Sequence, residues 1–191
     1  MGSLNPVSVE EALEVFGFQP PYHNVQFGSF TGNDTLIQWF NLLNRKFGVK
    51  GEGSIMFKLN GAQITHETDQ YAALDKLKEG LRSENTAFIY HCYNHYMCPI
   101  GFEMTPTKPI DAYQVTSEIA EFNHWVIVGE ISSCYPSFHV LKWEDIVKDI
   151  SCGYPEFFNV RKKDLGVQRK ESKAFTEGSK KGGNLHCIIQ F

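Results

Sequence analysis

The sequence has no long run of apolar residues. A membrane-spanning helix needs roughly 18 or more of them in succession, whereas the apolar residues here, 42% of the 191-residue chain, occur in short groups. The chain begins with MGSLNPVSVEEALEVF, which lacks the basic segment and apolar stretch of a secretory signal peptide. We therefore expect a protein that is neither anchored in a membrane nor exported.

Cysteines are few, and they do not form the regular framework of a disulfide-rich domain. There are five of them, an odd number, and most have apolar or aromatic neighbours. This usage favours reduced thiols in the cytosol or the nucleus. The five are Cys92, Cys98, Cys134, Cys152 and Cys187.

An excess of basic charge is also missing, because the formal net charge is -4. The basic residues gather near the C-terminus, where 161–181 holds eight Lys and Arg against three acidic residues. This strip contains one aromatic residue, Phe175, and is interrupted by Glu171 and Glu177, so nucleic-acid binding is not favoured over a solvated segment. We expect 161–183 to be a basic, mobile loop.

What remains is the composition of one globular domain, with 42% hydrophobic and 14% aromatic residues. Apolar spacing and capping residues predict helices over 9–16, 34–47, 71–81 and 142–150. Short apolar or aromatic runs predict strands over 54–58, 87–90, 96–102, 125–130 and 185–189. Helices come first and strands mostly later, which indicates an α+β fold in which N-terminal helices pack on a mainly antiparallel C-terminal sheet.

The stretch AFIYHCYNHYMCPIGFE, residues 87–103, is the most informative for function. It resembles the histidine strand of papain-like cysteine peptidases, in which an Asn-His or His-Tyr pair opens a strand that ends in Gly-aromatic. The resemblance implies a papain-like fold with His95 as the base that activates a thiol. The next strand ends at Glu130, where that family places the Asn or Asp that orients the histidine.

Less specific interpretations of these residues stay open. His95 could be a strand-edge histidine bonded to a backbone carbonyl, and Asn94 rather than Glu130 could meet its ring. Glu130 could be a solvated carboxylate at a strand end. A zinc cluster of four neighbouring Cys and His side chains is disfavoured, because alternate side chains of an extended chain face opposite ways. That cluster would be His91, Cys92, His95 and Cys98, and we expect no metal site and no cofactor.

Six unusual strings carry a second resemblance, which spans residues 4–191 in order and spacing. They are EEALEVFGFQPPY, FTGNDTL, FIYHCYNHYMCPIGFE, HWVIVGE, KWEDIV and GGNLHCII. Together they are similar to the basic immunoglobulin-like variable motif-containing protein family. The resemblance implies a cytoplasmic and nuclear protein of undefined biochemical role.

The longer members of that family have a Cys-Gly segment before the region where this chain begins. No cysteine precedes Cys92 here, so the resemblance implies one papain-like domain over 1–191 that lacks its nucleophile segment and is inactive alone. The alternative is a non-catalytic module that binds a protein or peptide segment in the cleft beside His95. Its rim would comprise residues 20–22 and the loop 27–30.

Overall fold

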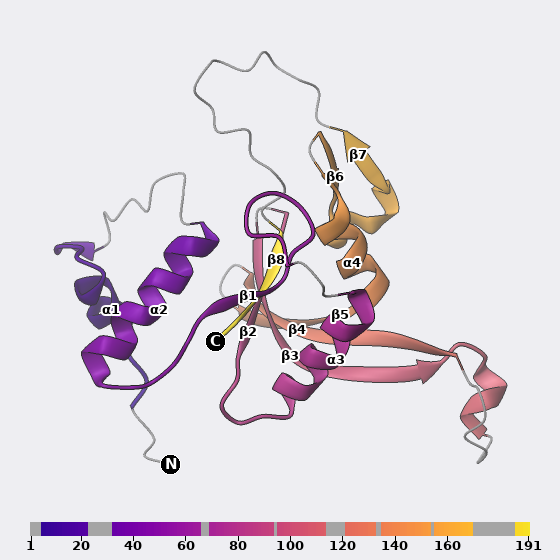
Figure 1. The fold of residues 1–191 in the computed structure, drawn as a ribbon, viewed down its shortest axis with the longest axis horizontal. Helices are drawn as coiled ribbons and strands as arrows, with labels where there is room; N and C mark the ends of the chain where they lie inside the picture. Colours follow the sequence, from indigo (N-terminus) through magenta and orange to yellow (C-terminus); the bar gives the residue numbers. More distant parts are fainter. Residues whose placement is uncertain are drawn as a thin grey trace. The chain divides into compact units, whose positions relative to one another are not determined.

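The structure, a computed structural model, describes residues 5–22, 32–65, 69–93, 95–113, 121–132, 135–153, 155–169 and 186–191 (Figure 1). The chain divides into two compact units, Met1–Ser54 and Ile55–Phe191, and each is described by itself. Within these described ranges, no helix combines the length and the apolar content needed to cross a bilayer.

The N-terminal unit contains helices α1 (Val9–Val15) and α2 (Asn33–Phe47), close to the predicted ranges. Ser8 caps α1 by accepting a hydrogen bond from the backbone N–H of Glu11 at 3.1 Å. The sequence predicts Asn33 or Asp34 as the cap of α2, but Gly32 occupies that position, with no side-chain cap. The ring of Trp39 on α2 stacks on Phe16 with the centroids 4.6 Å apart.

The larger unit is built on a six-stranded sheet with the order β1-β8-β2-β3-β4-β5. The strands are β1 (Ser54–Phe57), β2 (Phe88–Cys92), β3 (His95–Pro106), β4 (Phe122–Ser132), β5 (Tyr135–Lys142) and β8 (Cys187–Gln190). The pairs β8-β2, β2-β3, β3-β4 and β4-β5 are antiparallel. Two helices, α3 (Gln70–Leu81) and α4 (Trp143–Ser151), complete an α+β arrangement with a mainly antiparallel sheet, as predicted.

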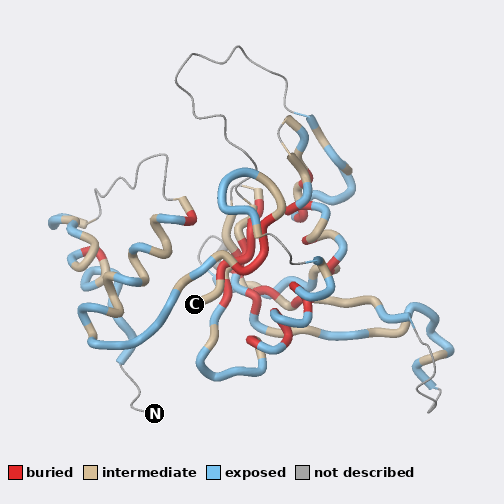
Figure 2. Tube along the Cα trace, viewed as in Figure 1, coloured by how far each residue is buried: buried red, intermediate tan, exposed pale blue. Residues whose placement is uncertain are grey.

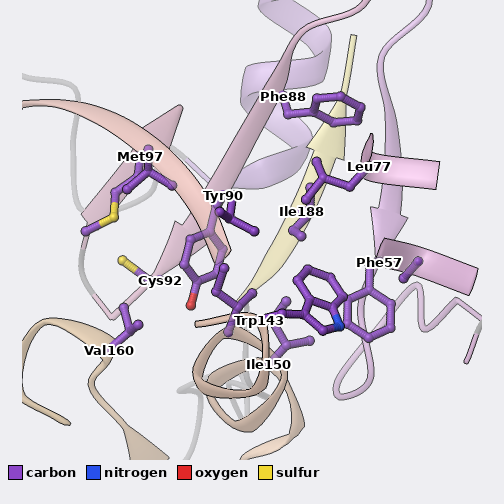
Figure 3. Packing of buried hydrophobic residues seen from close by; sticks show 14 of the residues in the cluster. Phe57, Leu77, Phe88, Tyr90, Cys92, Met97, Trp143, Ile150, Val160 and Ile188 are labelled. Atoms are coloured by element: carbon purple, nitrogen blue, oxygen red, sulfur yellow. The ribbon is translucent and has the colours of Figure 1, made fainter. Parts of the chain in front are cut away.

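The core of this unit lies where α3 and α4 contribute apolar side chains to the sheet. Buried residues are concentrated in the short central strands and these helices, while the long β3-β4 hairpin is half-exposed or exposed over its outer half (Figure 2). Trp143 of α4 lies beside Phe57 of β1 in the core (Figure 3). Leu74 and Leu77 of α3 and Ile146 and Ile150 of α4 belong to the same cluster.

The β3 strand is longer than predicted, because it continues beyond Phe102 to Pro106. Its register against β4 shifts between Pro99 and Gly101, so the proline sits at an irregularity where a missing N–H is tolerated. The hairpin leads to a 3-10 helix, η2 (Pro109–Tyr113) (Figure 1).

The start of the basic segment has regular structure, although a mobile loop is predicted from 161. Strands β6 (Glu156–Phe158) and β7 (Val167–Arg169) form a small sheet, joined by the 3-10 helix η3 (Val160–Leu165). Asn159 caps η3 through its side-chain oxygen, which accepts from the N–H of Arg161 at 3.0 Å, and Val160 is buried in the core. Residues 170–183 of the predicted loop lie outside the described residues.

Candidate functional site

His95 is the first residue of β3, directly after the turn from β2, and it pairs with Cys92 across the hairpin. Side chains alternate along a strand, and Met97 is buried in the core whereas Cys98 is exposed. His95 therefore shares the core face with Met97, as the sequence predicts. Its side chain lies at the margin of that face and is 21% exposed.

Glu130 lies on the neighbouring strand β4, on the same face of the sheet. Gly129 pairs with Cys98, so Glu130 alternates onto the face that carries the buried Val128. Its side chain is only 4% exposed, and its Oε2 contacts the Nε2 of His95. The predicted contact between the two residues is thus present, while a catalytic role for them stays a prediction. Asn94, the alternative partner, lies outside the described residues.

A second imidazole, which the sequence analysis missed, binds the other oxygen of the same carboxylate. His139 on β5 places its Nε2 2.9 Å from Oε1 of Glu130. Glu130 pairs with Ser137, which puts His139 two residues along on the same face. The His139 side chain is 45% exposed, so Glu130 joins a sheltered histidine to an accessible one.

The ionisation state of Glu130 fixes the direction of both hydrogen bonds. Burial opposes the charge of this carboxyl. The hydrogen bond and charge of His95, the hydrogen bond of His139 and the charge of Arg161 outweigh burial, so the pKa of the Glu130 carboxyl is lowered below its usual value. An ionised carboxylate only accepts hydrogen bonds, so each Nε2 carries the proton. In the neutral ring of His95 the basic nitrogen is then Nδ1.

An open pocket of about 380 Å³ lies along the same three strands, β3, β4 and β5. Gly129 provides space in its lining, because a Cβ there would meet no atom closer than 3.8 Å. The lining combines apolar groups with polar ones, among them Glu130 of β4 and Ser137 of β5. In full it consists of Tyr96, Cys98, Gly129, Glu130, Pro136, Ser137 and Phe138. Cys98, Gly129 and Phe138 pair across the three strands, so the pocket opens on the face of the sheet opposite His95.

The nearest described thiol is not in a reactive state. Cys92 is fully buried on the core face, and desolvation, followed by the negative charge of Asp149, raises the pKa of its thiol from 9.0 to about 12. Cys98 is exposed, but it lies on the opposite face from His95. Neither thiol meets the needs of a nucleophile that His95 activates. Cys134 lies outside the described residues.

These environments predict selective alkylation of the folded protein. With iodoacetamide at pH 8, Cys98 should be modified, whereas Cys92 should be protected by its burial and by the raised pKa of its thiol, about 12. Mass spectrometry of peptides after timed alkylation measures both rates. In urea the two rates should converge. Equal rates in the folded protein would contradict the burial of Cys92.

A further carboxylate centre lies elsewhere in the core, and it too was missed. Asp149 on α4 is fully buried and accepts a hydrogen bond from the hydroxyl of Tyr90 at 2.6 Å. Its other oxygen lies 2.8 Å from Nδ1 of His186. Asp149 thus links α4 to β2 and to the residue that precedes β8.

The alternative zinc cluster gains no support from the sheet. The strand register places Cys92 and His95 on the core face, whereas His91 stacks on Tyr96 on the other face. Across the described ranges, no group of three or more His, Cys, Asp and Glu is arranged to hold a metal ion.

The predicted binding rim beside His95 is not tested by the structure, because 27–30 is outside the described ranges and 20–22 belongs to the N-terminal unit.

Comparison with known proteins identifies relatives over the whole chain. The family model described as basic immunoglobulin-like variable motif-containing protein matches residues 1–191. Proteins of that name from Xenopus laevis and Homo sapiens are each 44% identical over all of this chain, which spans 37% of their length. One from Giardia intestinalis is 26% identical over 91% of the chain and 78% of its own length. No solved structure matches.

Proposed function

The chain belongs to the basic immunoglobulin-like variable motif-containing protein family, and we propose that it supplies the histidine-carboxylate half of a papain-like thiol hydrolase. The observation that carries this proposal is the contact of Glu130 with Nε2 of His95. A carboxylate in this position fixes the tautomer and the orientation of the ring. It also stabilises the imidazolium that forms when the ring accepts a proton.

In the proposed reaction, Nδ1 of His95 removes the proton of a cysteine thiol, and the thiolate adds to the carbonyl carbon of an amide or isopeptide bond in a protein. The C–N bond breaks, and the imidazolium returns its proton to the leaving nitrogen. Water then cleaves the resulting thioester, which releases the acid and regenerates the thiol. Cys92 is buried and its thiol pKa is raised, and the chain spans 37% of the length of its longer relatives; we therefore propose that the thiol belongs to a segment outside this chain.

The base assignment can be tested on this chain by ¹⁵N NMR of the histidine rings. The neutral ring of His95 should carry its proton on Nε2, because the Glu130 carboxylate accepts there. Replacing Glu130→Gln should alter that tautomer balance. A neutral His95 ring with its proton on Nδ1 would overturn the assignment.

Activity should be measured on the longest natural form of the protein, with a library of fluorogenic peptide amides. His95→Gln and Glu130→Gln should each lower kcat/KM by about 10²–10⁴-fold, as for loss of a positioned general base. His124→Gln on the same sheet is the matched control and should leave kcat/KM within about twofold. Unchanged turnover by His95→Gln would rule out the proposed role.

We also infer a cytoplasmic or nuclear setting for the protein. Cys92 and Cys98 are unpaired thiols, and unpaired thiols suit a reducing compartment better than an oxidising one. A fluorescent fusion imaged in intact cells tests this location, and secretion into the medium would contradict it.

A further inference from the structure

The β5 strand forms one edge of the six-stranded sheet, with β4 on its inner side. In an antiparallel pair, alternate residues of an edge strand direct their N–H and C=O groups away from the partner. In the part of the chain that the structure describes, the backbone hydrogen bonds of β5 are those to β4. The edge therefore presents a row of donors and acceptors to solvent.

The devices that usually block strand addition are confined to the ends of this edge strand. Proteins protect exposed edges with proline, lysine, bulges or very short strands. β5 has eight residues, with Pro136 near its start and Lys142 at its end, and its pairing with β4 runs from Tyr135 to Lys142 without a register shift. Residues 137–141 form an unblocked stretch. The strand at the opposite edge of the sheet, β1, has four residues.

The pocket lies against this same edge. Phe138 is 71% exposed, and its ring lies 3.8 Å from the Cβ position of Gly129, which opens the pocket floor. Val140, two residues along, is also exposed. Apolar side chains thus follow the edge on one face, while His139 follows it on the other and contacts Glu130.

We propose that β5 receives an extended polypeptide segment as a seventh strand, with one large apolar side chain of that segment in the pocket at Gly129. A strand satisfies the exposed backbone groups of an edge, and a pocket beside it selects alternate side chains. This inference goes beyond the proposed function, because the pocket opens on the face of the sheet opposite His95. It assigns extended polypeptide, rather than a folded surface, as the class of partner.

The test is an NMR titration of the isotope-labelled protein with acetyl-Lys-Thr-Thr-Phe-Thr-Thr-Lys-amide. The amide signals of residues 137–141 and of Gly129 should shift most. Replacing the Phe of the peptide with Asp should weaken binding at least tenfold. N-methylation of the Phe amide and of the preceding Thr amide should differ by at least tenfold, because a docked strand directs these two N–H groups to opposite sides.

Protein variants separate the pocket from the catalytic pair. Gly129→Val fills the pocket and should weaken peptide binding at least tenfold, whereas Gly101→Val, another glycine substitution in this sheet but outside the pocket lining, should not. His95→Gln, outside the pocket lining, should retain binding whether or not it lowers hydrolysis, so failure of the proposed function leaves this result intact. Equal loss with both N-methylated peptides would overturn strand addition. So would shifts at 137–141 that depend on protein concentration alone, which would indicate pairing with a second copy.

Discussion

Replacing Trp143 with alanine is expected to lower the free energy of unfolding by about 3–5 kcal/mol, the usual cost of removing a buried aromatic side chain. Trp143 is 1% exposed, and its ring packs on Phe57 with the centroids 5.8 Å apart. Its Nε1 donates a hydrogen bond to the carbonyl of Gln70 at 3.1 Å. One side chain therefore connects α4, β1 and α3, so its loss leaves a cavity where three elements meet.

Urea unfolding followed by circular dichroism measures this effect as a shift in midpoint at constant slope. Trp125→Ala is the matched control, because Trp125 is half-buried and donates to Thr105 at 2.8 Å on the long hairpin. It should cost clearly less than Trp143→Ala. Trp143→Phe keeps most of the packing but removes the hydrogen bond, so it should fall between wild type and Trp143→Ala. Equal losses for the two alanine variants would show that Trp143 does not organise the core.

The order of helices and strands is predictable from this sequence because the buried faces leave a periodic pattern. Leu74 and Leu77 mark the inward face of α3, and Trp143, Ile146 and Ile150 that of α4. The sequence YPSFHVLK of β5 has no such pattern, and it remains unassigned in a reading by periodicity. The burial pattern explains this, since none of the eight residues is fully buried and no alternate set forms an apolar face.

The candidate site is predictable only where neighbouring strands are also neighbours in the chain. His95 and Glu130 lie on consecutive strands, so strand order and alternation suffice to place them together. His139 was missed because its strand was missed. Asp149 lies on α4 and His186 directly precedes β8, and only the three-dimensional packing brings these two residues and Tyr90 together. No local spacing carries that information.

The buried carboxylate of Asp149 is the basis of the second large expected effect. Asp149→Ala should lower the free energy of unfolding by about 3–5 kcal/mol, since removing the carboxylate takes an acceptor from the buried hydroxyl of Tyr90 and from the part-buried ring of His186. The hydroxyl of Tyr90 and the ring of His186 would both lose a short hydrogen bond. That loss is a large share of the roughly 5–15 kcal/mol that stabilises a typical domain.

A double-mutant cycle separates this network from a general helix effect. Tyr90→Phe alone should cost about 1.5–3 kcal/mol, because its hydroxyl bonds to a charged acceptor, and the double variant should cost less than the sum of the two single ones.

Asp145→Ala is the control on the same helix, where the carboxylate is partly exposed and lies 3.8 Å from Nζ of Lys163. A surface pair of this kind contributes about 1 kcal/mol or less. Urea midpoints for the four variants decide the matter. If Asp149→Ala costs no more than Asp145→Ala, the buried carboxylate does not hold α4 to the sheet.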